Sequence, residues 1–131
     1  MEFLIKVQNH NIQKILNSGL DASLNKWSSN YSVSALYRKG IKMKDTENPD
    51  YLYGSIWDPI YAITHPWYRI DIILKNNEKK ILTYQGIKQG LLIMQENYSD
   101  YFNSFLKDNF SHDNGNVFLQ CALFEKVIFN V

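Results

Sequence analysis

The stretch NIQKILNSGLDASLNKW, residues 11–27, decides the fold that we expect for this chain. Its apolar and small residues recur at steps of three and four, which places them on one face of an α-helix. They are Ile12, Ile15, Leu16, Gly19, Leu20, Ser23, Leu24 and Trp27. The asparagine at position 9 or 11 can cap the start of this helix, and the small polar residues 28–30 predict its end. A glycine inside a helix costs about 1 kcal/mol relative to alanine, so we expect Gly19 to permit close approach of a packed neighbour.

The composition is that of one folded domain without a membrane segment. The chain has 131 residues, of which 45% are hydrophobic and 15% are aromatic, enough to form a core. Its 14 basic and 13 acidic residues give a formal net charge of +1, which argues against a nucleic-acid partner. The N-terminus lacks a signal-peptide pattern, and no apolar run approaches the ~20 residues needed to cross a bilayer. We therefore expect a cytoplasmic protein.

Alternation of apolar and polar residues predicts several β-strands. The clearest covers residues 69–75, and a second covers residues 79–82. Asparagine tolerates positive φ, so Asn76-Asn77-Glu78 between them predicts the turn of a hairpin. Two shorter segments also alternate, and a third fits either a strand or a helical turn. These three are residues 3–8, 41–44 and 31–36, respectively.

A second helix is expected after the hairpin. Thr83 is placed to cap it, and its apolar stripe has steps of four, three and four. This stripe is Ile87, Leu91, Met94 and Tyr98. At Ser99 or Asp100 the chain either starts a new helix or bends within the same one.

The end of the chain predicts a polar loop followed by a buried helix. Residues 108–116 are polar and include Gly115, which is typical of a loop. Residues 117–129 are apolar on almost every face, which is typical of a buried helix. The elements together predict a single α+β domain over residues 1–131, with a small, mostly antiparallel sheet packed against two to four helices.

Residues 45–68 interrupt this pattern with an aromatic-rich insert. Prolines break any long regular element in it, and Arg69 follows directly. Tyrosine, tryptophan and arginine dominate the hot spots of binding interfaces. We therefore interpret the insert either as a cover for the core or as a contact surface for a partner. The candidate binding residues are Tyr53, Trp57, Tyr61, Trp67 and Arg69.

No catalytic or metal-binding motif is evident in the sequence. His10, His65 and His112 are scattered and lack the spacing of metal ligands. Cys121, the only cysteine, lies in the most apolar helix, where we expect a buried thiol with a raised pKa and little reactivity. We therefore predict a protein that is not an enzyme and has no metal site and no cofactor.

Four segments carry a family resemblance. They are the Leu24-Asn25-Lys26-Trp27 end of the early helix, the leucine, glycine and alternating strand of residues 36–43, the Leu82-Thr83 opening of the second helix, and the run Gln120-Cys121-Ala122-Leu123-Phe124. In this order and spacing they resemble a group of small phage and prophage proteins of Gram-positive bacteria. The C-terminal run is the most similar part.

The resemblance implies an origin in a phage or another mobile element. Small proteins of that kind often bind a host or defence component, an argument by association. We therefore expect a non-enzymatic counter-defence inhibitor, similar in role to an anti-CRISPR protein, that acts by protein–protein contact in the host cytoplasm and that can form a homodimer. One alternative is a protein that captures a nucleotide signal between aromatic rings and a lysine or arginine. A small enzyme is a third interpretation.

Overall fold

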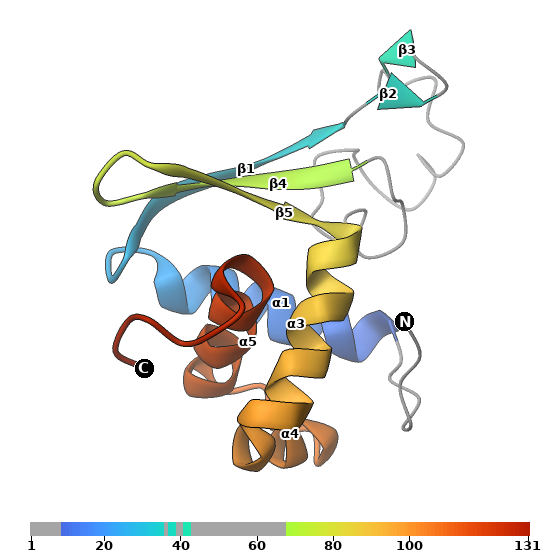
Figure 1. Cartoon of the computed structure of the whole chain (residues 1–131), viewed down its shortest axis with the longest axis vertical. Helices are drawn as coiled ribbons and strands as arrows, with labels where there is room; N and C mark the ends of the chain where they lie inside the picture. The colour runs from blue at the N-terminus through green and yellow to red at the C-terminus, as the bar shows by residue number, and fades with distance from the viewer. Residues whose placement is uncertain (1–8, 36, 39–40, 43–67) are drawn as a thin grey trace.

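The structure is a computed structural model that describes residues 9–35, 37–38, 41–42 and 68–131. Along the chain, one helix is followed by the strands, and the remaining helices follow the last strand (Figure 1). They are α1 (Asn9–Ser23), β1 (Ser28–Ala35), β2 (Tyr37–Arg38), β3 (Ile41–Lys42), β4 (Tyr68–Leu74), β5 (Lys79–Thr83), α3 (Tyr84–Asn97), α4 (Ser99–Leu106) and α5 (His112–Phe124).

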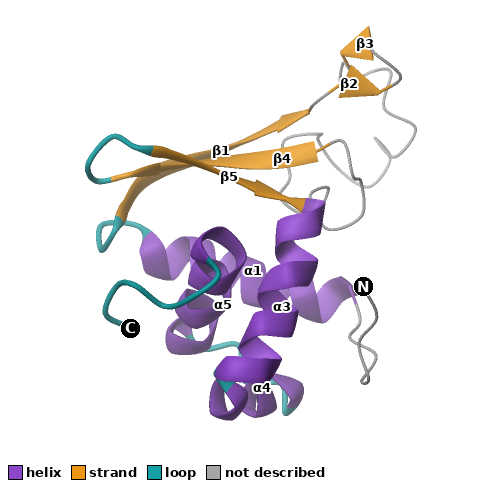
Figure 2. Cartoon of the chain, viewed as in Figure 1, coloured by secondary structure: helices purple, strands orange, loops and turns teal. Residues whose placement is uncertain are grey.

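One antiparallel sheet and one layer of helices make up the fold. The sheet has the order β1-β4-β5, and β2 pairs separately with β3. In the register of the sheet, Ile70 of β4 lies between Val33 of β1 and Leu82 of β5. All described helices lie on the same side of the sheet (Figure 2). The predicted α+β class, with an antiparallel sheet against several helices, is confirmed.

The core lies between the sheet and the helices. Alternate residues of β4 point into it, and Ile70, Ile72 and Leu74 are buried there together with Leu82 of β5. The apolar stripe of α1 meets them, as the three-and-four spacing predicts. Buried stripe residues include Ile12, Ile15, Leu16 and Leu20. Helix α5 completes the core with residues 117–119 and Cys121, all fully buried.

Glycines let the helices of this layer approach each other closely. A Cβ atom added to Gly19 of α1 would lie 2.5 Å from the backbone oxygen of Gly115 in α5. About two turns further along α5, a Cβ added to Gly90 of α3 would lie 2.7 Å from the Cα of Ala122. The predicted role of Gly19 is therefore confirmed. Ser18 Oγ supports the same crossing by donating a 2.8 Å hydrogen bond to the Ser111 carbonyl of the loop before α5.

Helix α1 ends earlier than predicted. It stops at Ser23, whose Oγ donates to the Leu20 carbonyl (3.0 Å), and the backbone turns at Asn25 with a φ of 67°. Trp27 therefore leaves the helix, although it stays buried. The expectation that residues 28–30 end the helix is wrong, because they form the start of β1.

Helix α5 begins earlier than predicted, so the loop expected at residues 108–116 is wrong in its second half. Ser111 caps the helix by accepting from the backbone N–H of Asn114 (3.3 Å). Gly115 lies inside the helix because α1 requires the space there. The helix ends at Phe124, since Glu125 adopts a left-handed φ of 64°, and residues 125–131 continue as a tail rather than as helix.

Several local predictions are confirmed. Thr83 Oγ1 caps α3 by accepting from the Gly86 N–H (3.0 Å), and Asn77 has the positive φ expected in the hairpin turn, 69°. Ser99 starts a separate helix, α4. Residues 31–36, which fitted a strand or a helical turn, belong to β1 as far as Ala35. The strand predicted at residues 3–8 lies outside the described residues. None of the described helices combines the length and the apolar character needed to cross a bilayer.

Candidate functional site

The structure places one of the five predicted binding residues. Tyr53, Trp57, Tyr61 and Trp67 lie outside the described residues, and their role stays a prediction. Arg69 is the second residue of β4. Because its neighbour Ile70 points into the core, the alternation of the strand directs Arg69 to the opposite side of the sheet. We call this side, which faces away from the helices in Figure 1, the outer face.

An acidic side chain flanked by two cationic ones lies on the outer face. Asp71 Oδ1 is 3.4 Å from Arg69 Nε, and Asp71 Oδ2 is 3.4 Å from Lys79 Nζ of β5. The carboxylate is mostly covered, whereas the side chains of Arg69 and Lys79 remain 31% and 49% exposed. The carboxylate thus lies between two cationic groups, each of which keeps part of its side chain exposed.

Two isoleucines complete this surface. Ile81 of β5 pairs with Asp71 in the sheet register, and Ile73 of β4 pairs with Lys79. Ile73 is half-buried, but Ile81 is 46% exposed, which is high for a large apolar residue. A mixture of exposed apolar and charged groups is typical of protein–protein interfaces. We name Arg69, Asp71, Ile73, Lys79 and Ile81 the outer-face patch.

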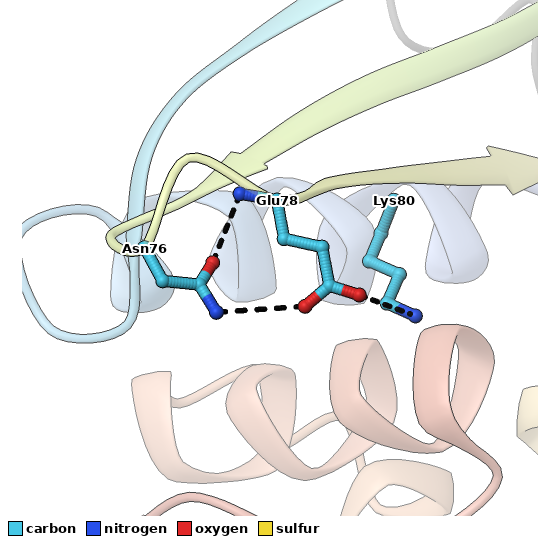
Figure 3. Close-up of polar contacts among 3 residues, drawn as sticks. All are labelled: Asn76, Glu78 and Lys80. Carbon is cyan, nitrogen blue, oxygen red and sulfur yellow. Dashed lines mark hydrogen bonds and ion pairs between the residues drawn. The ribbon is translucent and has the colours of Figure 1, made fainter.

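The hairpin turn fixes the two strands that carry the patch (Figure 3). Asn76 Oδ1 accepts from the Glu78 N–H (2.9 Å), and Asn76 Nδ2 donates to Glu78 Oε2 (3.5 Å). Glu78 Oε1 in turn lies 3.4 Å from Lys80 Nζ. Lys75 Nζ ties the turn to the α1–β1 connection by donating to the Asn25 carbonyl. These contacts join the ends of β4 and β5 next to the patch.

A hollow of about 230 Å³ lies at the same end of the sheet. It is lined by Lys26, Trp27, Leu74, Lys75, Asn76 and Phe129, and a neighbouring hollow of about 420 Å³ shares three of these residues. The Trp27 and Phe129 rings stack on each other, with centroids 5.3 Å apart and planes inclined by 6°. They therefore occupy the space that a nucleotide base would need between them. Small-molecule sites usually measure about 300–1,000 Å³; the smaller hollow lies below this range and the larger one lies within it. The observation against a base bound between these two rings is therefore their stacking on each other.

The polar side chains inside α5 hold the tail in place. Gln120 Oε1 accepts from the backbone N–H groups of Ile128 and Phe129 (2.8 Å each). Gln120 Nε2 donates to Asn116 Oδ1 (2.8 Å) and to the Phe129 carbonyl (3.2 Å). Trp27 Nε1 donates to the same Asn116 oxygen (3.0 Å). These groups thus act as structural links between α5, Trp27 and the tail.

Three of the residues considered for catalysis or metal binding lie among the described residues: Cys121, His10 and His112. Cys121 is fully buried, and burial raises the pKa of its thiol to about 12. His10 and His112 are exposed, and His65 lies outside the described residues. Within the described ranges, no three His, Cys, Asp or Glu side chains gather closely enough to hold a metal ion.

The burial of the Cys121 thiol leads to a testable prediction. Ellman's reagent at pH 8 is expected to leave Cys121 unmodified in the native protein, because the thiol is inaccessible and remains protonated well above neutral pH. Raising the pH to 9 should not speed the reaction appreciably. In urea, the same sample should release one equivalent of chromophore. Rapid modification of the native protein would show that α5 opens at this position.

Comparison of the chain with protein-family models, with curated proteins and with solved structures finds no match. The class of this protein is therefore assigned from its structure alone. It is a small α+β protein whose sheet has helices on one face and the outer-face patch on the other. The sequence named Arg69 as a candidate contact residue beside the aromatic insert, and its binding role stays a prediction; the alternation of β4 also directs Asp71 and Ile73 away from Ile70. The two patch residues on β5, Lys79 and Ile81, were not predicted as site residues. They are two positions apart, so strand alternation would have placed them on the same face.

Proposed function

We propose that this chain is a non-enzymatic binding protein that acts by protein–protein contact, as a counter-defence inhibitor encoded by a phage or another mobile element. The observation that supports this proposal most is the outer-face patch, where Lys79 and Ile81 are exposed beside the Arg69–Asp71 ion pair. The sequence resemblance to phage and prophage proteins supplies the biological setting. The burial of Cys121 argues for binding rather than nucleophilic chemistry.

The patch has the physical features of an interface centre. Arginine is enriched at hot spots, and an exposed isoleucine beside it offers apolar area that loses contact with water on binding. Asp71 already orients the guanidinium of Arg69, so less side-chain entropy is lost when a partner binds. The patch carries two cationic groups around one covered carboxylate, so it favours a partner surface with exposed acidic groups.

The patch is continuous in sequence with the predicted aromatic contact residues. Arg69 follows Trp67 by two positions. We propose that the predicted contact residues of the insert, Tyr53, Trp57, Tyr61 and Trp67, bind the same partner as the patch.

The test is a capture experiment with matched variants. Tagged wild-type protein, Arg69→Ala, Ile81→Asp and the control Lys107→Glu, whose residue is exposed beyond the end of α4, are incubated with lysates of several Gram-positive hosts. We expect a host protein that wild type and the control retain and that both patch variants bind at least about tenfold more weakly, equivalent to about 1.4 kcal/mol.

Circular dichroism of all four proteins checks that the fold is retained. Equal capture by all four would exclude the patch as the contact surface. Failure of wild type to capture any protein from every host tested would contradict the proposed function itself.

A further inference from the structure

The two edges of the sheet differ in charge. With the order β1-β4-β5, the described strands at the edges are β1 and β5 (Figure 2). Strand β5 carries adjacent lysines, Lys79 and Lys80. Lysines on an edge strand are a common protection against pairing with another chain. Strand β1 has the sequence SSNYSVSA, eight residues without a charge or a proline, so it lacks this protection.

The backbone of β1 directs hydrogen-bonding groups away from β4. The N–H of Tyr31 donates to Asn30 Oδ1 (2.8 Å), a side-chain acceptor, and not to a carbonyl of β4. Because the direction of these groups alternates along a strand, the backbone groups of Val33 point the same way as those of Tyr31. The exposed Asn30 side chain therefore supplies what the carbonyl of an added strand would supply, and it has to rotate away when such a strand pairs.

We propose that β1 pairs antiparallel with β1 of a second copy, so that two three-stranded sheets join into one six-stranded sheet. The absence of charge favours a second copy, because an identical strand meets no like charge when it pairs with itself. An acidic or basic strand of another protein would find no complementary charge on β1. The two copies would be related by a two-fold axis, the commonest symmetry of homo-oligomers.

The hydrogen-bond pattern selects the register. Ser28 is buried, and its carbonyl already accepts from Asn25 N–H (2.9 Å), so it is not available for pairing. Among the registers that match the outward groups and omit Ser28, the longest pairs Tyr31 with Val33 of the second copy. It places Ser32 opposite Ser32 of the second copy, on the outer face and at the two-fold axis. Both outer-face patches then lie on the same side of the joined sheet.

Ser32 is exposed, so a charge can be introduced there without disturbing the core. Ser32→Lys and Ser32→Glu each place like charges opposite each other at the axis. The matched control is Asn103→Lys, at an exposed position on α4, away from the sheet. Sedimentation equilibrium of the full chain is expected to give wild type and the control a mass about twice the 15.4 kDa of one chain.

We expect each Ser32 variant alone to dimerise at least about tenfold more weakly than wild type, and an equal mixture of the two to recover the wild-type dimer. Recovery in the mixture shows that both variants are folded. A wild-type protein that stays monomeric at all concentrations would overturn the proposal, as would a dimer that survives Ser32→Lys or is broken by Asn103→Lys. Because this test requires no host protein, its failure leaves the proposed function untouched.

Discussion

Replacing Gly115 with alanine is expected to lower the free energy of unfolding by about 3 kcal/mol or more. The new methyl group would overlap the backbone nitrogen of Gly19 and lie 2.7 Å from the carbonyl carbon of Ser18. Overpacking in a core usually costs about 1–3 kcal/mol, and it costs most where side chains cannot rotate away. Here the obstacle is the backbone of α1. The two helices must therefore separate along much of their contact.

Urea denaturation measures this effect, as a lower midpoint with an unchanged slope. The matched control is Gly86→Ala in α3, where the added Cβ would lie 3.3 Å from the Ala122 carbonyl oxygen and 3.4 Å from Thr83 Oγ1. This small crowding is offset by the better helix propensity of alanine, worth up to about 1 kcal/mol. The control should thus remain within about 1 kcal/mol of wild type. Equal stability of the two variants would show that α1 and α5 do not touch at Gly115.

Replacing Gln120 with leucine is expected to lower the free energy of unfolding by about 2–4 kcal/mol, because an unsatisfied buried polar group costs about 1–3 kcal/mol. Leucine fills a similar volume but cannot bond to Asn116 or to the tail. The N–H groups of Ile128 and Phe129 lose their acceptor, and Asn116 loses one of its two donors. The tail should therefore detach from Trp27 before the rest of the protein unfolds.

Two measurements separate this local effect from general destabilisation. Urea denaturation gives the stability, and digestion with carboxypeptidase at low denaturant gives the accessibility of the tail. We expect faster digestion in Gln120→Leu than in wild type, and no change in the control Gln85→Leu, whose glutamine is exposed on α3. Digestion at the wild-type rate in Gln120→Leu would mean that the tail is held by its aromatic contacts alone.

The elements that were predicted correctly are those that depend on residues close together in the sequence. The alternation through Ile70, Ile72 and Leu74 identifies β4 because period two needs only neighbouring residues. Thr83 identifies the start of α3 for the same reason, since a cap acts three residues away. The apolar stripe of α1 was correct up to Ser23, but the helix does not continue to Trp27.

The errors arise where a residue's role depends on a partner far along the chain. Gly115 and Asn116 are typical of a loop when considered alone. In the structure they lie within α5 because Gly115 meets Gly19 and Asn116 bonds to Trp27, 89 positions away. The candidate site shows the same limit. Arg69 was predicted, but its ion-pair group forms only when a hairpin places Lys79 beside Asp71.

The environment of Trp27 has a practical consequence. Its ring is 3% exposed, stacked on Phe129 of the tail, and its N–H is bonded inside the protein. In a chain with Trp57 and Trp67 changed to phenylalanine, all tryptophan emission would come from this one indole. The wavelength of this emission would then report whether the tail is bound. It is short while the tail covers the ring, and it becomes longer once water reaches the ring. Opening at one end of the molecule becomes visible without any attached dye.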